Sequence, residues 1–282
     1  MDISRTIAAI ILVAVASGCS VKEDRWPCPC RLTVELSDGI RLKEAGPVEL
    51  AVWSDEKGKE VEATLNPEDY PSGYRVEVTK GEKHVSAIVG RKNCTLEGNV
   101  IQGTAGNEFD KIYIHSSEVA CLSEEARDTI RLYKAFAEIA VELVDPTNAK
   151  RTFGINTEYT NAGLDILTCT PAGGAVSIPL KSDSERESGY VPVQKIDTTG
   201  RSNRLFRFIC PRQKDYKMVL SLYDGAGKKV NSIRLGELLH AAGYSWETAD
   251  LKDAFVRIDR TDSGVTLQIN DWITGEKKDI TI

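Results

Sequence analysis

The chain has 282 residues, a formal net charge of −6 at pH 7, and 36 basic side chains against 42 acidic ones. Because the basic residues are interspersed with acids, no basic stripe is available for phosphates, and the composition argues against nucleic-acid binding. The length predicts two domains, since typical domains have about 100 to 150 residues and single cores stop growing at about 250.

A short apolar segment near the N-terminus predicts export. The nine residues Ile7–Val15 follow Arg5 and precede Ala16-Ser17-Gly18-Cys19. A bilayer-spanning helix needs about 20 residues, whereas a signal-peptide core is shorter, so we expect residues 1–18 to be cleaved. The Cys19 thiolate is a nucleophile that can accept a diacylglycerol group. We therefore predict lipidation at Cys19; the alternative is an ordinary secretory signal that leaves this cysteine unmodified.

The segment after the cleavage site is expected to be a lipidated tether over residues 19–29. Pro27 and Pro29 stiffen it. Residues 20 to 31 reach at most about 40 Å at about 3.3 Å per residue, which is enough to hold a domain clear of a lipid surface. Several acyl chains on one cysteine would anchor the protein strongly, because each buried CH₂ contributes about 0.8 kcal/mol.

Six cysteines remain besides Cys19: Cys28, Cys30, Cys94, Cys121, Cys169 and Cys210. Export permits disulfides, but spacing alone does not rank the pairings. Cys28-Pro29-Cys30 is the only tight cluster, which makes Cys28 and Cys30 candidates for a disulfide or another structural role. A zinc site would need a second close cysteine pair or two histidines at ligand spacing, and the three histidines lie far apart. We predict no metal site.

The first half of the chain alternates apolar and polar side chains repeatedly, which is the period of half-buried strands. The first run places Leu32, Val34 and Leu36 on one face. Glycine, proline, asparagine and aspartate separate the runs, as short antiparallel connections require. Further strands are expected at 48–53, 61–65, 74–78, 84–89 and 111–115. The pattern predicts an N-terminal β-sandwich over residues 30–127.

The alternation breaks at residues 116–128, where Ser123 could cap a short helical turn, and we expect the domain joint there. Residues 130–144 alternate again and favour a strand, although their alanines leave a helix as an alternative. Residues 236–243 predict one short helix with a glycine stop. Strands are expected at 152–155, 175–180, 190–193, 205–209, 217–223, 255–258 and 265–269. The sequence therefore predicts an all-β fold with a second β-sandwich over residues 128–282.

Motifs for catalysis are missing from the sequence. Asp224–Lys229 lacks the spacing of a phosphate-binding loop and predicts a hairpin turn. Neither a GxSxG nor an HExxH motif occurs, and the acidic residues flank turns or alternate along strands. We predict no catalytic residues, no cofactor and no enzymatic activity. Trp53 and Trp272 are expected to be core or edge aromatics, with sugar stacking as the alternative.

The lipidation site, the charged segment Lys22-Glu23-Asp24-Arg25, and Cys28-Pro29-Cys30 running into the strand at 32–36 resemble the start of a known family. This family is the Bacteroidales minor-fimbrium anchor subunits, fimbrillin-associated lipoproteins with tandem transthyretin-like domains. Residues 265–272 are similar to its penultimate strand. The resemblance implies two tandem transthyretin-like antiparallel β-sandwich domains and a lipid anchor in the outer membrane, facing the cell exterior.

The resemblance also implies a function as the base subunit of a fimbrium, with a stalk subunit as its partner. Such fimbriae assemble when the terminal strand of one subunit fills a groove in another. Lipid on Cys19 would oppose loss of the first strand, because cleavage at Arg31 or Arg41 would cut the tether. The candidate donor strand is Lys278, Asp279, Ile280, Thr281 and Ile282. The alternatives are a surface glycan-binding lipoprotein, which needs an exposed aromatic platform, and a secreted hydrolase on a β scaffold.

Overall fold

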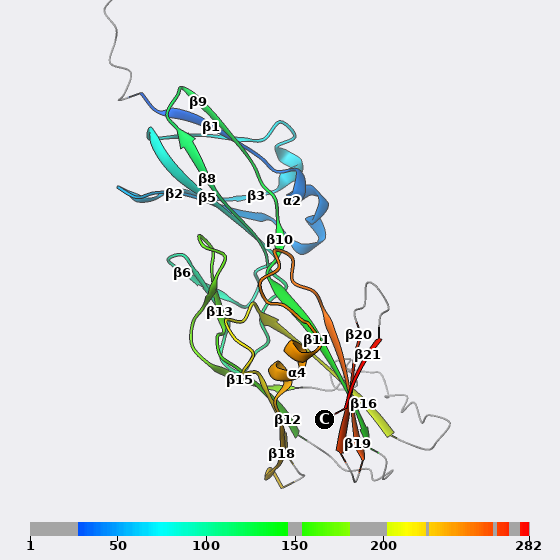
Figure 1. Cartoon of the computed structure of the whole chain (residues 1–282). Coiled ribbons are helices and arrows are strands. Elements are labelled where there is room, and N and C mark those ends of the chain that lie inside the picture. The colour runs from blue at the N-terminus through cyan, green and yellow to red at the C-terminus, as the bar shows by residue number, and fades with distance from the viewer. Residues whose placement is uncertain are drawn as a thin grey trace, which may run out of the picture.

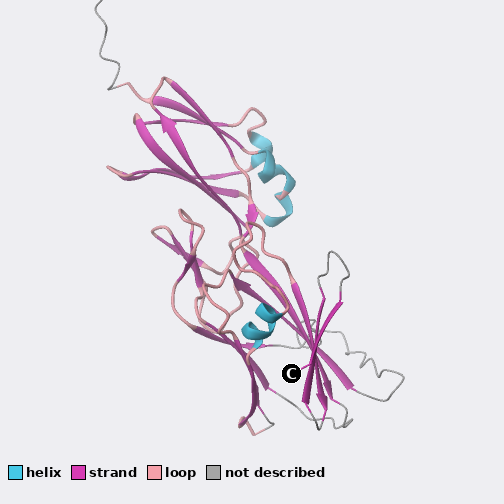
Figure 2. Ribbon diagram, in the orientation of Figure 1, coloured by secondary structure: helices cyan, strands magenta, loops and turns pink. Residues whose placement is uncertain are grey.

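A computed structural model describes residues 28–145, 154–180, 202–223, 226–261, 264–270 and 277–281. Strands dominate it and the helices are short, which confirms the predicted all-β class (Figure 2). Cys19, the tether up to residue 27, the strand predicted at 190–193, Trp272 and Ile282 lie outside the described residues. In the part that is described, no helix combines the length and hydropathy needed to cross a membrane.

The N-terminal lobe packs two sheets against each other (Figure 1). In the smaller sheet, β1 (Cys30–Glu35) lies between β4 (Tyr74–Val78), which is antiparallel to it, and β9 (Glu125–Thr129), which is parallel. The larger sheet has the order β10 (Tyr133–Lys134), β8 (Tyr113–Cys121), β5 (Gly81–Val89), β2 (Val48–Ser54) and β3 (Gly58–Leu65).

The C-terminal lobe also has two sheets. One has the order β16 (Ser202–Pro211), β11 (Phe136–Asp145), β19 (Ala254–Thr261), β20 (Gly264–Asn270) and β21 (Lys277–Thr281). The other has the order β15 (Val176–Leu180), β12 (Gly154–Tyr159), β17 (Val219–Tyr223) and β18 (Lys229–Ile233). The predicted helix at 236–243 is confirmed as α4 (Leu235–Ala241), and Gly243 follows it with a φ of 84°.

The two lobes repeat one topology. In each, the first strand lies between an antiparallel neighbour and a parallel last strand, in the orders β4-β1-β9 and β16-β11-β19. The facing sheets also correspond, since β8-β5-β2-β3 matches β18-β17-β12-β15. The C-terminal lobe extends its first sheet by β20 and β21, whereas the N-terminal sheet ends at β9. Apart from these two parallel pairs, the ladders between the described strands are antiparallel, and the predicted tandem sandwiches are confirmed.

A bridging sheet joins the lobes. It consists of β6 (Thr95–Glu97) and β7 (Val100–Gln102) from the first half of the chain, and β13 (Gly163–Asp165) and β14 (Pro171–Ala172) from the second. Ile101 of β7 lies opposite Leu164 of β13, and both side chains are fully buried. They belong to a third apolar cluster that draws residues from both halves. The lobes are therefore held together by backbone ladders as well as by side-chain packing.

Short helical segments cover one side of the N-terminal lobe (Figure 2). They are α2 (Ser37–Arg41), η1 (Lys43–Ala45) and η2 (Pro67–Asp69). Gly39 lets α2 approach β2 closely, because a Cβ there would lie 2.7 Å from Val48 Cγ2. α2 and η1 follow β1 directly, so the chain leaves the strand in a compact, packed connection, whereas η2 follows β3.

The helical turn predicted within residues 116–128 is wrong. β8 runs through Cys121, and β9 begins at Glu125 after a bend in which the Ser123 hydroxyl donates to the Glu125 carbonyl oxygen. The segment is polar because β9 lies at a sheet edge and its alternate residues, Ala126 and Asp128, are only partly buried. The domain boundary predicted between residues 127 and 128 falls inside β9, whereas the strand predicted over 130–144 is confirmed as β11, beginning at Phe136.

Candidate functional site

The candidate site is the β1 groove, by which we mean the space between β4 and β9 that β1 fills. Cys30, Leu32 and Val34 point into the core and are fully buried. Arg31 is exposed on the opposite face, as the alternation of a strand requires. Burial of such apolar side chains stabilises a fold by about 1.5 to 3 kcal/mol each. β1 is thus an integral part of the N-terminal core.

Both backbone edges of β1 are paired. On one side Cys30 lies opposite Val78, and the ladder continues along β4. On the other side the ladder with β9 is framed by two further bonds: Arg31 N–H donates to the Glu124 carbonyl oxygen at 2.8 Å, and Ile130 N–H donates to the Glu35 carbonyl oxygen at 3.0 Å. A second strand can enter this groove only if β1 leaves it.

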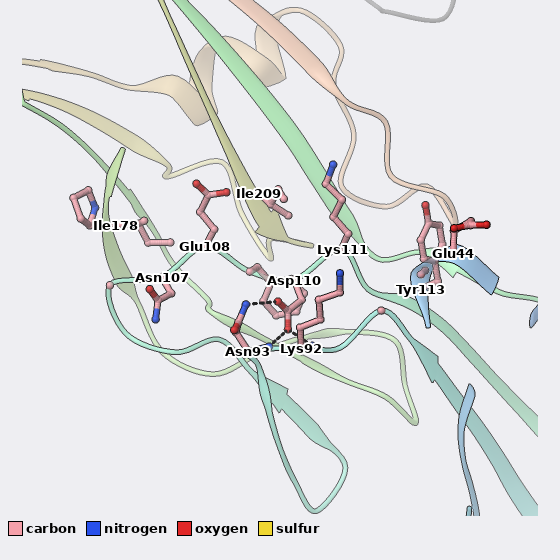
Figure 3. A pocket seen from close by; sticks show the side chains of 15 residues that line it. Glu44, Lys92, Asn93, Asn107, Glu108, Asp110, Lys111, Tyr113, Ile178 and Ile209 are labelled. Carbon is pink, nitrogen blue, oxygen red and sulfur yellow. Dashed lines mark hydrogen bonds between the residues drawn. The ribbon is translucent and has the colours of Figure 1, made fainter. Parts of the chain in front are cut away.

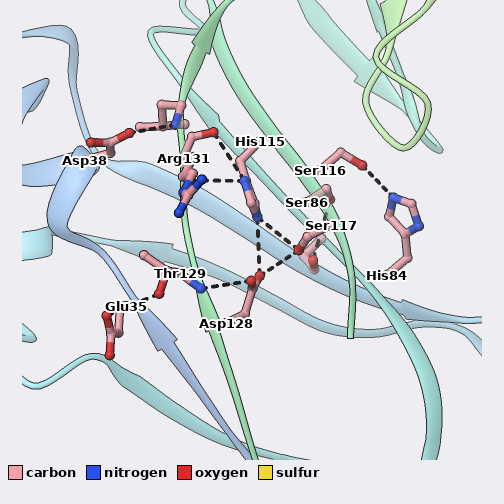
Figure 4. Close-up of polar contacts among 12 residues, drawn as sticks. Glu35, Asp38, His84, Ser86, His115, Ser116, Ser117, Asp128, Thr129 and Arg131 are labelled. Carbon is pink, nitrogen blue, oxygen red and sulfur yellow. Dashed lines mark hydrogen bonds and ion pairs between the residues drawn. The ribbon is translucent and has the colours of Figure 1, made fainter. Parts of the chain in front are cut away.

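Side chains at the C-terminal end of β1 add contacts to the segment that contains β9 (Figure 4). The Glu35 carboxylate lies 3.3 Å from Arg127 Nη1 and accepts a hydrogen bond from the Thr129 hydroxyl at 3.2 Å. Asp38 accepts a hydrogen bond from Leu132 N–H at 3.0 Å. Exposed ion pairs contribute about 0 to 1 kcal/mol, so the buried side chains and the two ladders hold β1 more strongly than these contacts do.

A polar cluster fastens β9 to β8 (Figure 4). Ser117 donates to Asp128 Oδ2 at 2.7 Å, and His115 Nε2 lies 3.3 Å from the same oxygen. The other ring nitrogen of His115 lies 3.1 Å from the backbone nitrogen of Arg131. Burial raises the pKa of Asp128, but the hydrogen bonds from His115 and Ser117 outweigh it and lower the pKa below its usual value.

The same cluster does not have the geometry of a catalytic triad. In a triad the histidine stands between the serine and the carboxylate, whereas here Ser117 and His115 both contact one oxygen of Asp128. The cluster therefore acts as a structural link between strands. The cluster was not predicted from the sequence, because the three residues have no motif spacing and β8 and β9 belong to different sheets that approach each other only in the folded lobe.

The predicted structural cysteines stand at the start of β1. Cys28 is exposed and Cys30 is fully buried, and all six described cysteines carry free thiols. The two residues are therefore not paired with each other in this structure. Among the described residues, no group of three or more histidine, cysteine or acidic side chains could hold a metal ion.

The predicted donor residues Lys278–Thr281 lie in β21. This strand is antiparallel to β20, with Ile269 opposite Lys278 and Thr266 opposite Thr281. It is the last strand of its sheet, so its second edge has no strand partner among the described residues. β21 belongs to the C-terminal lobe, while the β1 groove belongs to the N-terminal lobe (Figure 1).

A hollow of about 740 Å³ lies at the junction of the lobes, with Asp110 in its wall (Figure 3). Asp110 Oδ2 accepts hydrogen bonds from the backbone N–H groups of Lys92, Asn93 and Cys94 at 2.8, 2.7 and 2.8 Å. Burial raises the pKa of Asp110, but these bonds lower it below its ordinary value. The Asp110 carboxylate is committed to holding the loop before β6, and Glu44 and Glu108 are the other acidic residues that line the hollow.

The glycan alternative needs an exposed aromatic platform. Trp53 Nε1 donates to the Ser86 hydroxyl at 3.2 Å, and the Lys59 ammonium lies 5.1 Å from the centre of the ring. One face of Trp53 is thus covered. The exposed large apolar side chains of the described residues are Ile40, Leu122, Tyr133 and Val230. They come from separate segments and include a single aromatic ring, so these residues form no platform.

No protein-family model matches the chain, and no curated protein matches its sequence. The fimbrial anchor protein Mfa2 from Porphyromonas gingivalis is similar in structure, with a TM-score of 0.60 at 10% identity over 87% of this chain and 98% of Mfa2. A candidate adhesin from Bacteroides ovatus has a TM-score of 0.60 at 13% identity, over 90% of this chain and 96% of its own. The chain has the fold of these proteins.

A candidate adhesin from Bacteroides thetaiotaomicron agrees, with a TM-score of 0.57 at 15% identity over 91% of this chain and 99% of its own. The matches span both lobes. They support the family resemblance stated from the sequence, and at such identities the likeness establishes the fold alone.

Proposed function

We propose that this protein is the base subunit of a fimbrium. As an outer-membrane lipoprotein held by lipid on Cys19, it attaches the shaft to the cell surface and ends its growth by β-strand complementation. The observation that carries the proposal is the occupied β1 groove, with both edges of β1 paired and its apolar side chains buried. A subunit in this state can donate a strand but cannot accept one.

The place of the tether supports an anchoring role. β1 begins at Cys30, directly after the expected tether, so the lipid and the strand belong to one continuous segment. Arg41, the next site at which a protease could release β1, is exposed at the end of α2. A cut there would remove both the strand and its lipid. An anchor must therefore keep β1, whereas a stalk subunit must lose the strand that fills its groove.

The two extra strands of the C-terminal lobe support its role as the strand donor. β20 and β21 extend the C-terminal sheet beyond the topology that the lobes share. β21 is paired with β20 alone among the described strands, so donating it to a stalk subunit costs one ladder and leaves the rest of the sheet in place. The bridging sheet then links the donor lobe to the tethered lobe, so that pulling force can pass through backbone hydrogen bonds.

The likeness to the fimbrial anchor protein Mfa2 is consistent with this assignment. The decisive experiment is electron microscopy of cells that lack the gene, with the growth medium examined in parallel. We expect longer filaments, and filaments shed into the medium. Filaments of normal length that stay attached would contradict the proposal, and loss of polysaccharide binding in such cells would favour the glycan-binding alternative.

A further inference from the structure

We propose that Cys30 and Cys121 form a disulfide that ties β1 to β8 across the N-terminal sandwich. The bond itself is inferred from strand register and burial. Its consequence for anchoring, given below, rests on the proposed function.

Strand register brings the two cysteines to one pole of the lobe. Cys30 is the first residue of β1 and lies opposite Val78, the last residue of β4. Cys121 is the last residue of β8 and lies opposite Gly81, the first residue of β5. Only two residues separate Val78 from Gly81, and this short connection crosses from one sheet to the other. Cys30 and Cys121 therefore lie at the same end of the sandwich, one in each of its two sheets.

The two cysteines also share one buried environment. Both cysteines are fully buried in the same apolar cluster. Burial and, after it, the neighbouring Cys30 thiol raise the pKa of Cys121 to about 12. A disulfide needs Cβ atoms about 3.5 to 4.5 Å apart, a separation that the backbone fixes, and rotation about each Cα–Cβ bond then brings the two sulfur atoms to bonding distance.

The other cysteines have different surroundings. Cys94 lies beside Asp110 in the cluster between the lobes, and Cys169 packs against that cluster. Cys210 is buried in the C-terminal core, where its thiol faces the Ala137 carbonyl oxygen. Cys28 is exposed, two residues before Cys30. This makes Cys28 a matched control for Cys30, because it shares the local sequence without the burial.

The oxidant is a protein or small-molecule disulfide of the kind found outside the cytoplasm. Cys30 and Cys121 lose two protons and two electrons as their S–S bond forms, and the oxidant's S–S bond is reduced to two thiols. The attacking species is a thiolate, and burial keeps Cys121 protonated in the folded lobe. The bond therefore forms while the lobe folds, before the sandwich closes over the two residues.

The disulfide would change what happens when the chain is cut. Any cut between residues 30 and 121, including one at the exposed Arg41, would leave the lipidated N-terminus and β1 attached to the body of the protein. For a base subunit under tension, this secures the one strand that must not be lost. A closed loop of this length also restricts the unfolded chain, so the bond should stabilise the N-terminal lobe.

Peptide mapping of the full-length lipoprotein, purified from membranes in detergent, tests the bond directly. Free thiols are alkylated under denaturing conditions, and the protein is digested with trypsin without reduction. Cleavage after arginine and lysine places Cys30 in residues 26–31 and Cys121 in residues 112–127. We expect a linked pair of these peptides in the wild type and in Cys28→Ser, and its loss in Cys30→Ser and in Cys121→Ser.

A second measurement does not depend on mass assignment. A site-specific protease sequence is inserted in the exposed turn at Asp55–Lys57, between β2 and β3. After cutting, the two fragments should migrate together in a denaturing gel and separate only when reductant is added. Fragments that separate without reductant, or alkylation of both Cys30 and Cys121 in all molecules, would overturn the disulfide. A pairing of Cys121 with Cys28 would overturn it too.

The bond and the anchoring function can fail separately. If the linked peptide is absent while cells lacking the gene still shed filaments, the disulfide is wrong and the base-subunit role stands. If the linked peptide is present while those cells keep normal filaments, the disulfide is confirmed, but the base-subunit role and the effect of the disulfide on anchoring are wrong.

Discussion

The ammonium nitrogen of Lys83 lies 3.1 Å from a carboxylate oxygen of Glu60, and the two side chains are only 2% and 9% exposed. Thr79 completes this buried cluster. Its backbone N–H and its hydroxyl donate to Glu60 at 3.0 and 2.7 Å, and its hydroxyl accepts from Lys83 at 3.1 Å. The cluster connects β3, β5 and the β4–β5 connection at the pole where β1 begins.

Replacing Glu60 by glutamine should strongly destabilise the N-terminal lobe, because Lys83 would keep a buried charge with no carboxylate to balance it. Removing one partner of a buried pair costs about 3 to 5 kcal/mol of unfolding free energy. Urea unfolding followed by tryptophan fluorescence measures the change. Glu62→Gln is the matched control on the same strand, since Glu62 is 66% exposed and its pair with Lys59 should be worth at most about 1 kcal/mol. Equal losses in the two variants would contradict the prediction.

Acid should weaken the same lobe over a defined range. Burial raises the pKa of Glu60, but hydrogen bonds from Thr79, Ser54 and Lys83 lower it from 4.5 to about 2. Because the folded pKa lies below the unfolded one, the stabilisation is fully present above about pH 4.5 and is lost as the pH falls toward about 2. The pKa of Asp128 is also lowered in the folded protein, so its stabilising contribution is likewise lost on acidification. Urea midpoints measured across this range should fall on acidification, less steeply in Glu60→Gln, and midpoints that rise instead would refute the assignment.

The bridging sheet should be sensitive to one methyl group. A Cβ on Gly163 would lie 2.5 Å from the carbonyl oxygen of Ile101, so Gly163→Ala must push β13 away from β7. We expect a loss of about 1 to 3 kcal/mol, typical of overpacking, and faster hydrogen exchange in β7. Gly174→Ala is the control, because no atom lies within 4 Å of a Cβ there. Unchanged exchange in Gly163→Ala would show that the bridge is not held by this pairing.

Removing residues 278–282 should abolish attachment of the shaft without affecting attachment of the protein to the membrane. The truncated protein is expected to remain in the membrane fraction but to retain fewer filaments on cells, because a stalk subunit would receive no donor strand. Cys19→Ala should have the reverse effect, releasing the protein while leaving its binding to stalk subunits in solution intact. Membrane fractionation and filament counts measure both variants, and normal filament retention after the truncation would rule out β21 as the donor.

Sequence alternation predicted strands best where one face is buried. β1, β2 and β5 each bury alternate or consecutive apolar residues over six or more positions, long enough for the period to be recognised. The strands of the bridging sheet are two or three residues long and have no measurable period. The segment of β9 is polar because an edge strand needs few apolar residues, and its polarity was interpreted as a domain joint.

The candidate site was predictable in part. A first strand at 32–36 and a C-terminal strand at 278–282 were expected, and the structure has strands at Cys30–Glu35 and Lys277–Thr281. The parallel pairing of β1 with β9 was not foreseen, because it joins segments almost a hundred residues apart. For the same reason the sequence identified Cys28 and Cys30 as neighbours and gave no sign of Cys121, which meets Cys30 through strand register.

The all-β class and the positions of most long strands follow from the amino-acid sequence, since alternation is a property of consecutive residues and reports local burial. Folding sets the rest: which strands are neighbours, the pairing of β1 on both edges, and the bridging sheet that joins the lobes. Those relations depend on contacts between distant segments. Backbone hydrogen bonds use groups common to nearly all residues, so the sequence of a strand does not identify its partner.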